Sequence, residues 1–197
     1  MNTLKSLLED LTSGDETRAE AAVAPLLGMG EEAVPALLEL TRSPDVDSRW
    51  WALRVLAASP HLQSEWLVPF LEDPAPEVRQ CAALGLAGRP DERAVEKLIR
   101  ALNDEDSMVA TLAANALVKT GSPAVPSLIE VAKRPTVEGS GSQSQRIHAL
   151  RALAEIRDHR AIPVMMQVMQ EDSALLQHWA QEGLERLGLD MVYIKTQ

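Results

Sequence analysis

The chain carries the stretch Arg79-Gln-Cys-Ala-Ala-Leu-Gly-Leu86, and close variants of it stand at Ala110-Thr-Leu-Ala-Ala-Asn-Ala-Leu117 and Arg146-Ile-His-Ala-Leu-Arg-Ala-Leu153. Three fainter copies bring the total to six, and the first small residue of each copy defines a column. The column consists of Ala21, Ala52, Ala82, Ala113, Ala149 and Ala180, at successive spacings of 31, 30, 31, 36 and 31 residues. Self-similarity at such a period is typical of repeat proteins.

Two further columns follow at offsets of three and four residues. The small-residue column contains Ala24, Val55, Gly85, Ala116, Ala152 and Gly183. The mostly leucine column contains Pro25, Leu56, Leu86, Leu117, Leu153 and Leu184. Offsets of three and four place all three columns on one face of a helix, where small side chains let neighbouring helices approach closely.

A second helical pattern precedes each motif, with copies at 33–40, 94–101, 124–131 and 161–168. Pro35, Pro126 and Pro163 read as starts of these helices, because the first turn tolerates proline. The second helices are predicted to end at Gly30, Gly121 and Gly188. Acidic residues stand at or just before the starts of second helices, where they can act as caps: Asp15, Asp45, Asp104 and Asp172. The pattern predicts an all-α solenoid of about six helix–turn–helix repeats in one domain, 1–197. The repeats are 2–30, 31–60, 61–90, 91–121, 122–157 and 158–188, with a tail at 189–197.

Charge and cysteine content exclude several classes of protein. The formal net charge is −10, from 19 basic and 29 acidic residues, so no basic stripe is available for nucleic acid or an anionic membrane. Cys81 is the sole cysteine, which excludes an internal disulfide. The N-terminal stretch lacks the features of a signal peptide, and no apolar run approaches the ~20 residues that span a bilayer. We therefore expect a cytoplasmic protein.

The stretch Pro76-Glu-Val-Arg-Gln-Cys-Ala-Ala-Leu-Gly-Leu86, followed by residues 91–104, resembles HEAT-repeat proteins of the short phycobilisome-lyase HEAT-like type. The resemblance covers roughly residues 3–188 and implies a right-handed superhelix in which the second helices line the concave face. It also implies a ladder of arginines that pair with acidic groups of adjacent repeats. Arg18, Arg49, Arg79 and Arg146 match this ladder, whereas Ala110 and Gln177 interrupt it.

Positions one and five residues after the arginine point away from the predicted core. The first row contains Trp50, Gln80, Thr111, Ile147 and His178, and the second contains Arg54, Leu84, Asn115, Arg151 and Glu182. This concave surface has little acid and carries Trp and Arg, which are enriched at interface hot spots. It is predicted to bind a protein partner, although a solvated face with stray apolar residues is the alternative. Trp50 is expected to be exposed and Trp51 packed.

Motifs of catalysis and metal binding are missing from the sequence. It has no nucleophile elbow, phosphate-binding loop or zinc motif, and no His-Glu pair of the kind that HEAT-like di-iron hydroxylases repeat. Cys81 reads as a packed thiol, and the offsets of His148 and His178 do not favour a metal site. We expect no enzyme activity, cofactor or metal. The Gly/Ser-rich insertion around 137–144 is expected to be a loop, either a solvated insertion or one that grips a partner.

Three functions follow from these observations. The first is a non-enzymatic scaffold that binds a protein on the concave face, alone or within a larger complex. The second, from the resemblance alone, is a bilin-lyase-like or phycobiliprotein-handling subunit. The third is a HEAT-like DNA-repair glycosylase, which the net charge of −10 disfavours.

Overall fold

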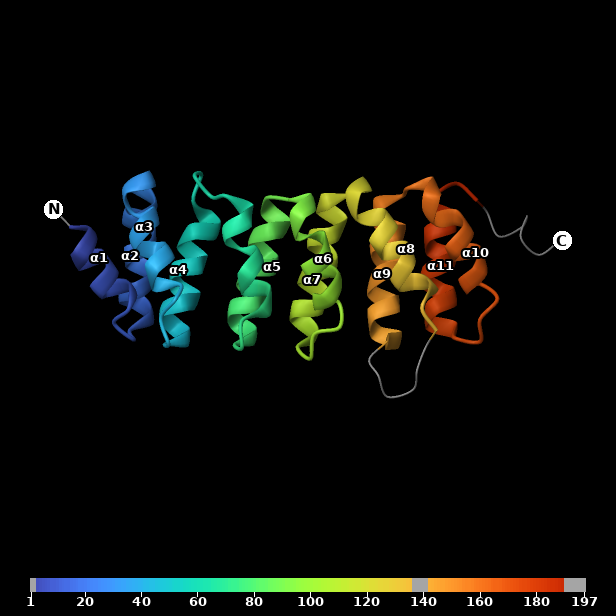
Figure 1. Cartoon of the computed structure of the whole chain (residues 1–197), viewed down its shortest axis with the longest axis horizontal. Helices are drawn as coiled ribbons and strands as arrows, with labels where there is room; N and C mark the ends of the chain where they lie inside the picture. The colour runs from blue at the N-terminus through green and yellow to red at the C-terminus, as the bar shows by residue number, and fades with distance from the viewer. Residues whose placement is uncertain (1–2, 136–141, 190–197) are drawn as a thin grey trace. The chain divides into compact units, whose positions relative to one another are not determined.

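The structure is a computed structural model that describes residues 3–135 and 142–189, and within those ranges it contains helices and no strand (Figure 1). The chain divides into two compact units, residues 1–89 and 90–197. The boundary falls one residue before the predicted junction of the third and fourth repeats. The single-domain organisation over 1–197 stays a prediction.

Each predicted repeat contains a second, longer helix that carries the repeated motif. In the first unit these helices are α2 (Glu16–Gly28), α4 (Val46–Ala58) and α5 (Pro76–Gly88). In the second unit they are α7 (Ser107–Thr120), α9 (Ser142–Ile156) and α11 (Ala174–Arg186). The all-α repeat architecture predicted from the periodicity is confirmed.

The first helices of the repeats are shorter. They are α1 (Leu4–Leu11), α3 (Val34–Leu40), α6 (Val95–Ala101), α8 (Val125–Lys133) and α10 (Ile162–Val168). Pro35, Pro126 and Pro163 lie in their first turns, as predicted. The third repeat differs, because its first helix is the 3₁₀ helix Val68–Glu72.

The predicted helix ends are largely confirmed. Gly121 ends α7 with φ 71°, and Gly30 and Gly188 follow α2 and α11 with φ 60° and 81°. Asp15 and Asp45 accept hydrogen bonds from the backbone N–H groups of Arg18 and Ser48 as N-caps. The cap of α7, however, is Asp106.

The first repeat is in a different register from the one predicted. Ala21, Ala24 and Pro25 are exposed, while Ala22 and Leu26 are buried. Counting from the capping aspartates, Ala19 of α2 corresponds to Arg49 of α4, since both lie four residues after the cap. The arginine position of this repeat is therefore Ala19, and Leu26 occupies the leucine column. Arg18 is outside the ladder and pairs with Asp10.

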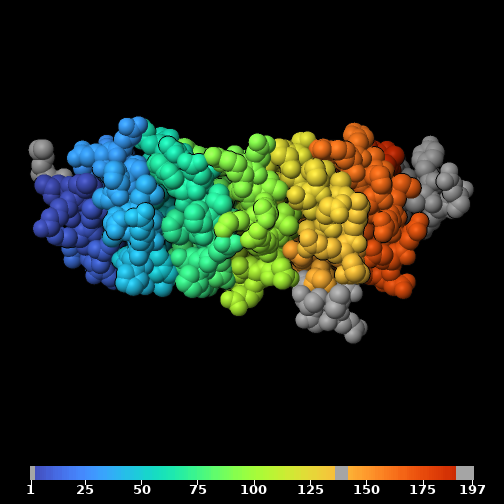
Figure 2. Space-filling view, in the orientation of Figure 1, coloured from blue at the N-terminus to red at the C-terminus, as the bar shows by residue number. Residues whose placement is uncertain are grey.

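Buried side chains of the repeated columns build the core of each unit. In the first unit α2 and α3 contact α4, and α4 contacts α5. In the second unit α9 contacts α7, α8 and α11. The space-filling view shows the colours following one another in bands within each unit, as expected when each repeat packs on its sequence neighbours (Figure 2).

Arginines of the ladder are buried and join consecutive segments. Arg49 binds Asp73 and the backbone oxygens of Ser43 and Pro44. Arg146 donates to Glu171 and to the backbone of Ala132. The pairing implied by the resemblance is thus present for these two arginines.

The two residues predicted to interrupt the arginine ladder, Ala110 and Gln177, differ in whether they replace the arginine's hydrogen bonds. Gln177 donates to the backbone oxygen of Glu171 at 2.6 Å, so its amide replaces part of the arginine's role. Ala110 is buried and carries no polar side chain.

Two predicted features lie wholly or partly outside the described residues. Of the insertion at 137–144, residues 137–141 are outside, and Ser142 already begins α9. Of the tail at 189–197, only Leu189 is described. Across the described part of the chain, no single helix has the length and apolarity to cross a membrane, although Glu16–Gly28 and Gly30–Leu40 pass that test as a pair bent by 119°.

Candidate functional site

Four of the predicted site residues lie on the first unit. Trp50 and Arg54 lie one turn apart on α4, and Gln80 and Leu84 lie at the equivalent positions of α5. Trp51 is buried, as predicted, whereas Trp50, which was expected to be exposed, is only partly exposed and packs against the core. Leu84 is 60% exposed. We call these four residues the Trp50 face.

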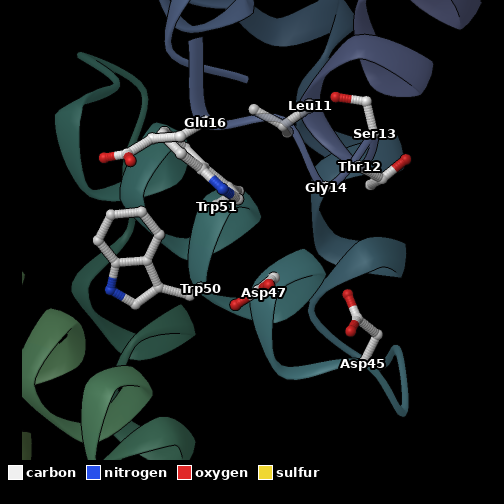
Figure 3. A pocket seen from close by; sticks show the side chains of 9 residues that line it. All are labelled: Leu11, Thr12, Ser13, Gly14, Glu16, Asp45, Asp47, Trp50 and Trp51. Carbon is white, nitrogen blue, oxygen red and sulfur yellow. The ribbon is translucent and has the colours of Figure 1, made fainter. Parts of the chain in front are cut away.

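An open pocket of about 490 Å³ lies on one side of Trp50. Its wall is formed by the end of α1, the turn to α2 and the first turns of α2 and α4. The lining residues are Leu11, Thr12, Ser13, Gly14, Glu16, Asp45, Asp47, Trp50 and Trp51 (Figure 3). In this view Asp47 lies between the indole of Trp50 and the carboxylate of Asp45.

A second open pocket, of about 570 Å³, lies between the first turns of α4 and α5. It is lined by Val46, Asp47, Trp50, Ala75, Glu77 and Gln80. The two pockets therefore share Asp47 and Trp50. Neither of the two linings includes a lysine, arginine or histidine, so both pockets have a negative potential.

The carboxylate of Asp45 is held in its charged form. It accepts hydrogen bonds from the hydroxyl and the backbone N–H of Ser48, at 2.6 and 2.8 Å. These bonds lower the pKa of Asp45 below its ordinary value. The wall of the first pocket therefore stays negative through the neutral range.

Arg54 is occupied within the protein. Its guanidinium lies over the rings of Trp50 and Trp51, 5.4 and 4.9 Å from their centroids. It also donates to Glu20 of α2, with a distance of 3.0 Å from Nη2 to Oε1. These contacts hold the two indoles, which meet edge to face at 4.8 Å, in a fixed arrangement. Arg54 is therefore best described as a support for Trp50.

The other six predicted site residues lie on the second unit, at equivalent positions of α7, α9 and α11. Most of their polar groups bond within the unit. Arg151 donates to Asn115 at 2.6 Å, Thr111 donates to the backbone oxygen of Ser107, and Glu182 accepts from Arg186. Ile147 is partly buried and His178 is exposed, with its ring against Trp179. Asn115 and Arg151 thus link α7 to α9.

Cys81 and the histidines could, by residue type, take part in catalysis or metal binding, and their surroundings favour neither role. Burial raises the pKa of the Cys81 thiol to about 11, which disfavours the thiolate and supports the packed-thiol prediction. Burial, with a smaller contribution from Arg151, lowers the pKa of His148. Within the described ranges no three histidine, cysteine, aspartate or glutamate side chains are grouped to hold a metal ion.

Four acidic residues on this surface were missed by the sequence reasoning, which expected little acid there. Glu16, Asp47 and Glu77 line the pockets, and Glu20 pairs with Arg54. The sequence does indicate two of them. Asp47 and Glu77 stand three residues before Trp50 and Gln80, a spacing that puts side chains on one helix face. Glu20 was missed because the alanine spacing places the first repeat one residue out of register.

Comparison with protein families gives two matches. Residues 64–139 match the model for HEAT repeats, and residues 145–171 match the model for the PBS lyase HEAT-like repeat. Together the two segments cover more than half of the chain. No curated protein matches the sequence.

Solved structures with a similar fold have little sequence in common with this chain. The archaeal HEAT-like repeats protein from Thermococcus onnurineus NA1 has a TM-score of 0.60 at 15% identity, over 94% of this chain and 80% of that one. The complex of CpcE and CpcF of phycocyanin lyase from Nostoc sp. PCC7120 gives 0.55 at 23% identity, over 74% and 96%. An engineered protein gives 0.54 at 23%, over 95% and 97%. At these identities the likeness concerns the fold alone.

Proposed function

Because the chain belongs to the HEAT-repeat family, we propose that it is a non-enzymatic interaction module whose Trp50 face binds a protein partner. Stacked helical repeats form extended surfaces for binding. The observation that carries the proposal is the position of Trp50. Its partly exposed indole forms a wall of two open pockets and lies one helix away from exposed Leu84.

The composition of the Trp50 face supports this function. Tryptophan is enriched at the centres of protein interfaces, where a rigid aromatic side chain fills a pocket of the partner or lines one of its own. Contacts with Arg54 and Trp51 restrict the indole of Trp50 in the free protein. Binding a partner therefore costs little further side-chain entropy at Trp50. A preorganised aromatic side chain between two pockets is suited to recognition.

The proposal is tested by affinity capture from a lysate of the source organism, with mass spectrometry of the bound proteins. The baits are the wild type, a Trp50→Ala/Leu84→Ser variant and a Leu175→Ser control. Leu175 of α11 is 58% exposed, so it matches Leu84 in residue type and exposure but lies on the other unit. A partner lost only from the Trp50→Ala/Leu84→Ser bait is the expected result. Equal capture by all three baits would count against the Trp50 face.

A bilin-lyase-like or phycobiliprotein-handling role is the second candidate. Its support is the match of residues 145–171 to the PBS lyase HEAT-like repeat. The test is incubation of the purified chain with a bilin and an apo-phycobiliprotein, followed by absorbance and gel fluorescence of the protein-bound chromophore. Neither binding nor transfer of the bilin would remove this candidate.

A further inference from the structure

Carboxylates of the first unit fall into two groups according to their partners. Most are ion-paired, hydrogen-bonded or used as helix caps. Among the described residues of this unit, four have neither a hydrogen bond nor an ion pair to their side chains: Glu16, Glu32, Asp47 and Glu77. Three of these four line the two pockets beside Trp50.

The unpaired carboxylates come from three different helices. Glu16 is in the first turn of α2, Asp47 in that of α4 and Glu77 in that of α5. They converge because consecutive second helices stack with their first turns side by side. Asp45, held charged by Ser48, adds a third carboxylate to the first pocket, beside Glu16 and Asp47. Negative charge thus gathers in the same concavities that the indole of Trp50 lines.

We infer that the two pockets beside Trp50 receive lysine or arginine side chains of one extended basic segment of a protein partner. The inference rests on the proposed function and specifies the chemistry of its partner. A cation in either pocket gains attraction from the carboxylates, and also from an indole where it lies over the face of the ring. Two pockets that share a wall suit two side chains of one segment better than a single small cation.

A role in helix stability is the competing account of the same carboxylates. Acidic side chains in a first turn interact favourably with the helix dipole whether or not a ligand binds. That account predicts a change in thermal stability on neutralisation and no effect on peptide binding beyond that of net charge. Matched charge changes elsewhere on the unit therefore separate the two.

The experiment is an NMR titration of the whole chain with two synthetic nonapeptides, one alternating serine with lysine and one alternating serine with glutamate. The readout is the indole N–H resonance of Trp50, assigned with Trp50→Phe, with Trp179 of the second unit as internal reference. The variants are Glu16→Gln/Asp47→Asn/Glu77→Gln and a control, Glu9→Gln/Glu32→Gln/Glu39→Gln. Both triple variants remove three negative charges from the first unit.

The lysine peptide is expected to shift the Trp50 resonance with saturation, and the glutamate peptide is expected to leave it in place. The variant Glu16→Gln/Asp47→Asn/Glu77→Gln should weaken binding of the lysine peptide about tenfold. The control variant Glu9→Gln/Glu32→Gln/Glu39→Gln should weaken it less than about twofold. Thermal melts of both variants establish that each is folded at the titration temperature.

Three results would overturn the inference: no shift with the lysine peptide, equal shifts with both peptides, or equal weakening by the two triple variants. Each of these leaves the capture experiment with Trp50→Ala/Leu84→Ser untouched. Capture that depends on Trp50 without binding of the lysine peptide would mean that the Trp50 face binds a partner of other chemistry. Failure of this inference is therefore distinct from failure of the proposed function.

Discussion

Arg49 and Asp73 form a two-pronged ion pair that joins α4 to the segment before α5. The Nε and Nη2 atoms of Arg49 each lie 2.9 Å from an oxygen of Asp73, and the side chains are 11% and 7% exposed. Arg49 also donates to the backbone oxygens of Ser43 and Pro44, and Asp73 accepts from the backbone N–H of Ala75. The ion pair thus holds two turns of the chain in place, the one at residues 43–44 and the one at residues 73–75.

Replacing Arg49 by methionine is expected to cost about 3 kcal/mol of unfolding free energy, because the carboxylate of Asp73 stays buried without its cation. The measurement is urea denaturation followed by circular dichroism. The double variant Arg49→Met/Asp73→Asn should recover part of the loss, since it leaves no buried charge. The control is Arg42→Met, which breaks an exposed pair with Glu39 and should change stability by less than about 0.5 kcal/mol.

Gly85 marks a close approach of α5 to the preceding segments, as the small-residue column predicted. A Cβ at this position would lie 2.6 Å from Cδ1 of Leu67 and 3.1 Å from Cβ of Ala57. Gly85→Ala is therefore expected to lower stability by about 1–3 kcal/mol. Gly88→Ala, in the same helix with no atom within 4 Å of the new Cβ, should raise it by about 0.5 kcal/mol. Similar effects of the two variants would contradict the packing account.

The register of the first repeat is tested by two neighbouring residues of α2. Leu26 is 1% exposed, and Leu26→Ala is expected to cost about 2–5 kcal/mol. Pro25 is exposed within the helix, and Pro25→Ala should raise the thermal midpoint because it restores a backbone N–H donor. If Pro25 occupied the leucine column instead, Pro25→Ala would destabilise the protein and Leu26→Ala would cost little.

His148 links stability to pH in the acidic direction. Its Nδ1 atom is buried without a hydrogen-bond partner, and burial lowers its pKa below the ordinary value of 6.5. As the pH falls through that value, the unfolded chain takes up a proton before the folded chain does, so stability is lost until the pH reaches the folded pKa. Unfolding free energies measured between pH 7.5 and 5.5 should therefore fall less in His148→Gln than in the wild type. His159→Gln, which removes an exposed imidazole, is the control and should keep the wild-type pH dependence.

The repeat architecture could be predicted because it depends on local periodicity. Small residues and leucines at offsets of three and four specify one helix face, and prolines and glycines at regular places specify where helices begin and end. These signals lie within a few residues of each other, so one sequence is enough to find them. The burial of Trp51, the packed state of Cys81 and the close approach at Gly85 followed from the same columns.

The electrostatic character of the candidate site depended on contacts between repeats. Arg54 faces outward on its helix, as the periodicity indicates, but Glu20 of the preceding repeat pairs with it. Asn115 and Arg151 are likewise outward positions that bond to each other across two helices. The one-residue shift in the first repeat also hid Glu20, because a capping aspartate and not the alanine spacing sets that register.

The sequence by itself determined the helices, their order and the side of each that is buried, since these follow from backbone propensity and the 3.6-residue period. Only the tertiary structure decided which outward side chains are free to meet a partner. Glu16, Asp47 and Glu77 are about 30 residues apart in sequence, and stacking of their helices brings them to the pockets beside Trp50. Charge adds up through space, so their joint effect is not a property of any one repeat.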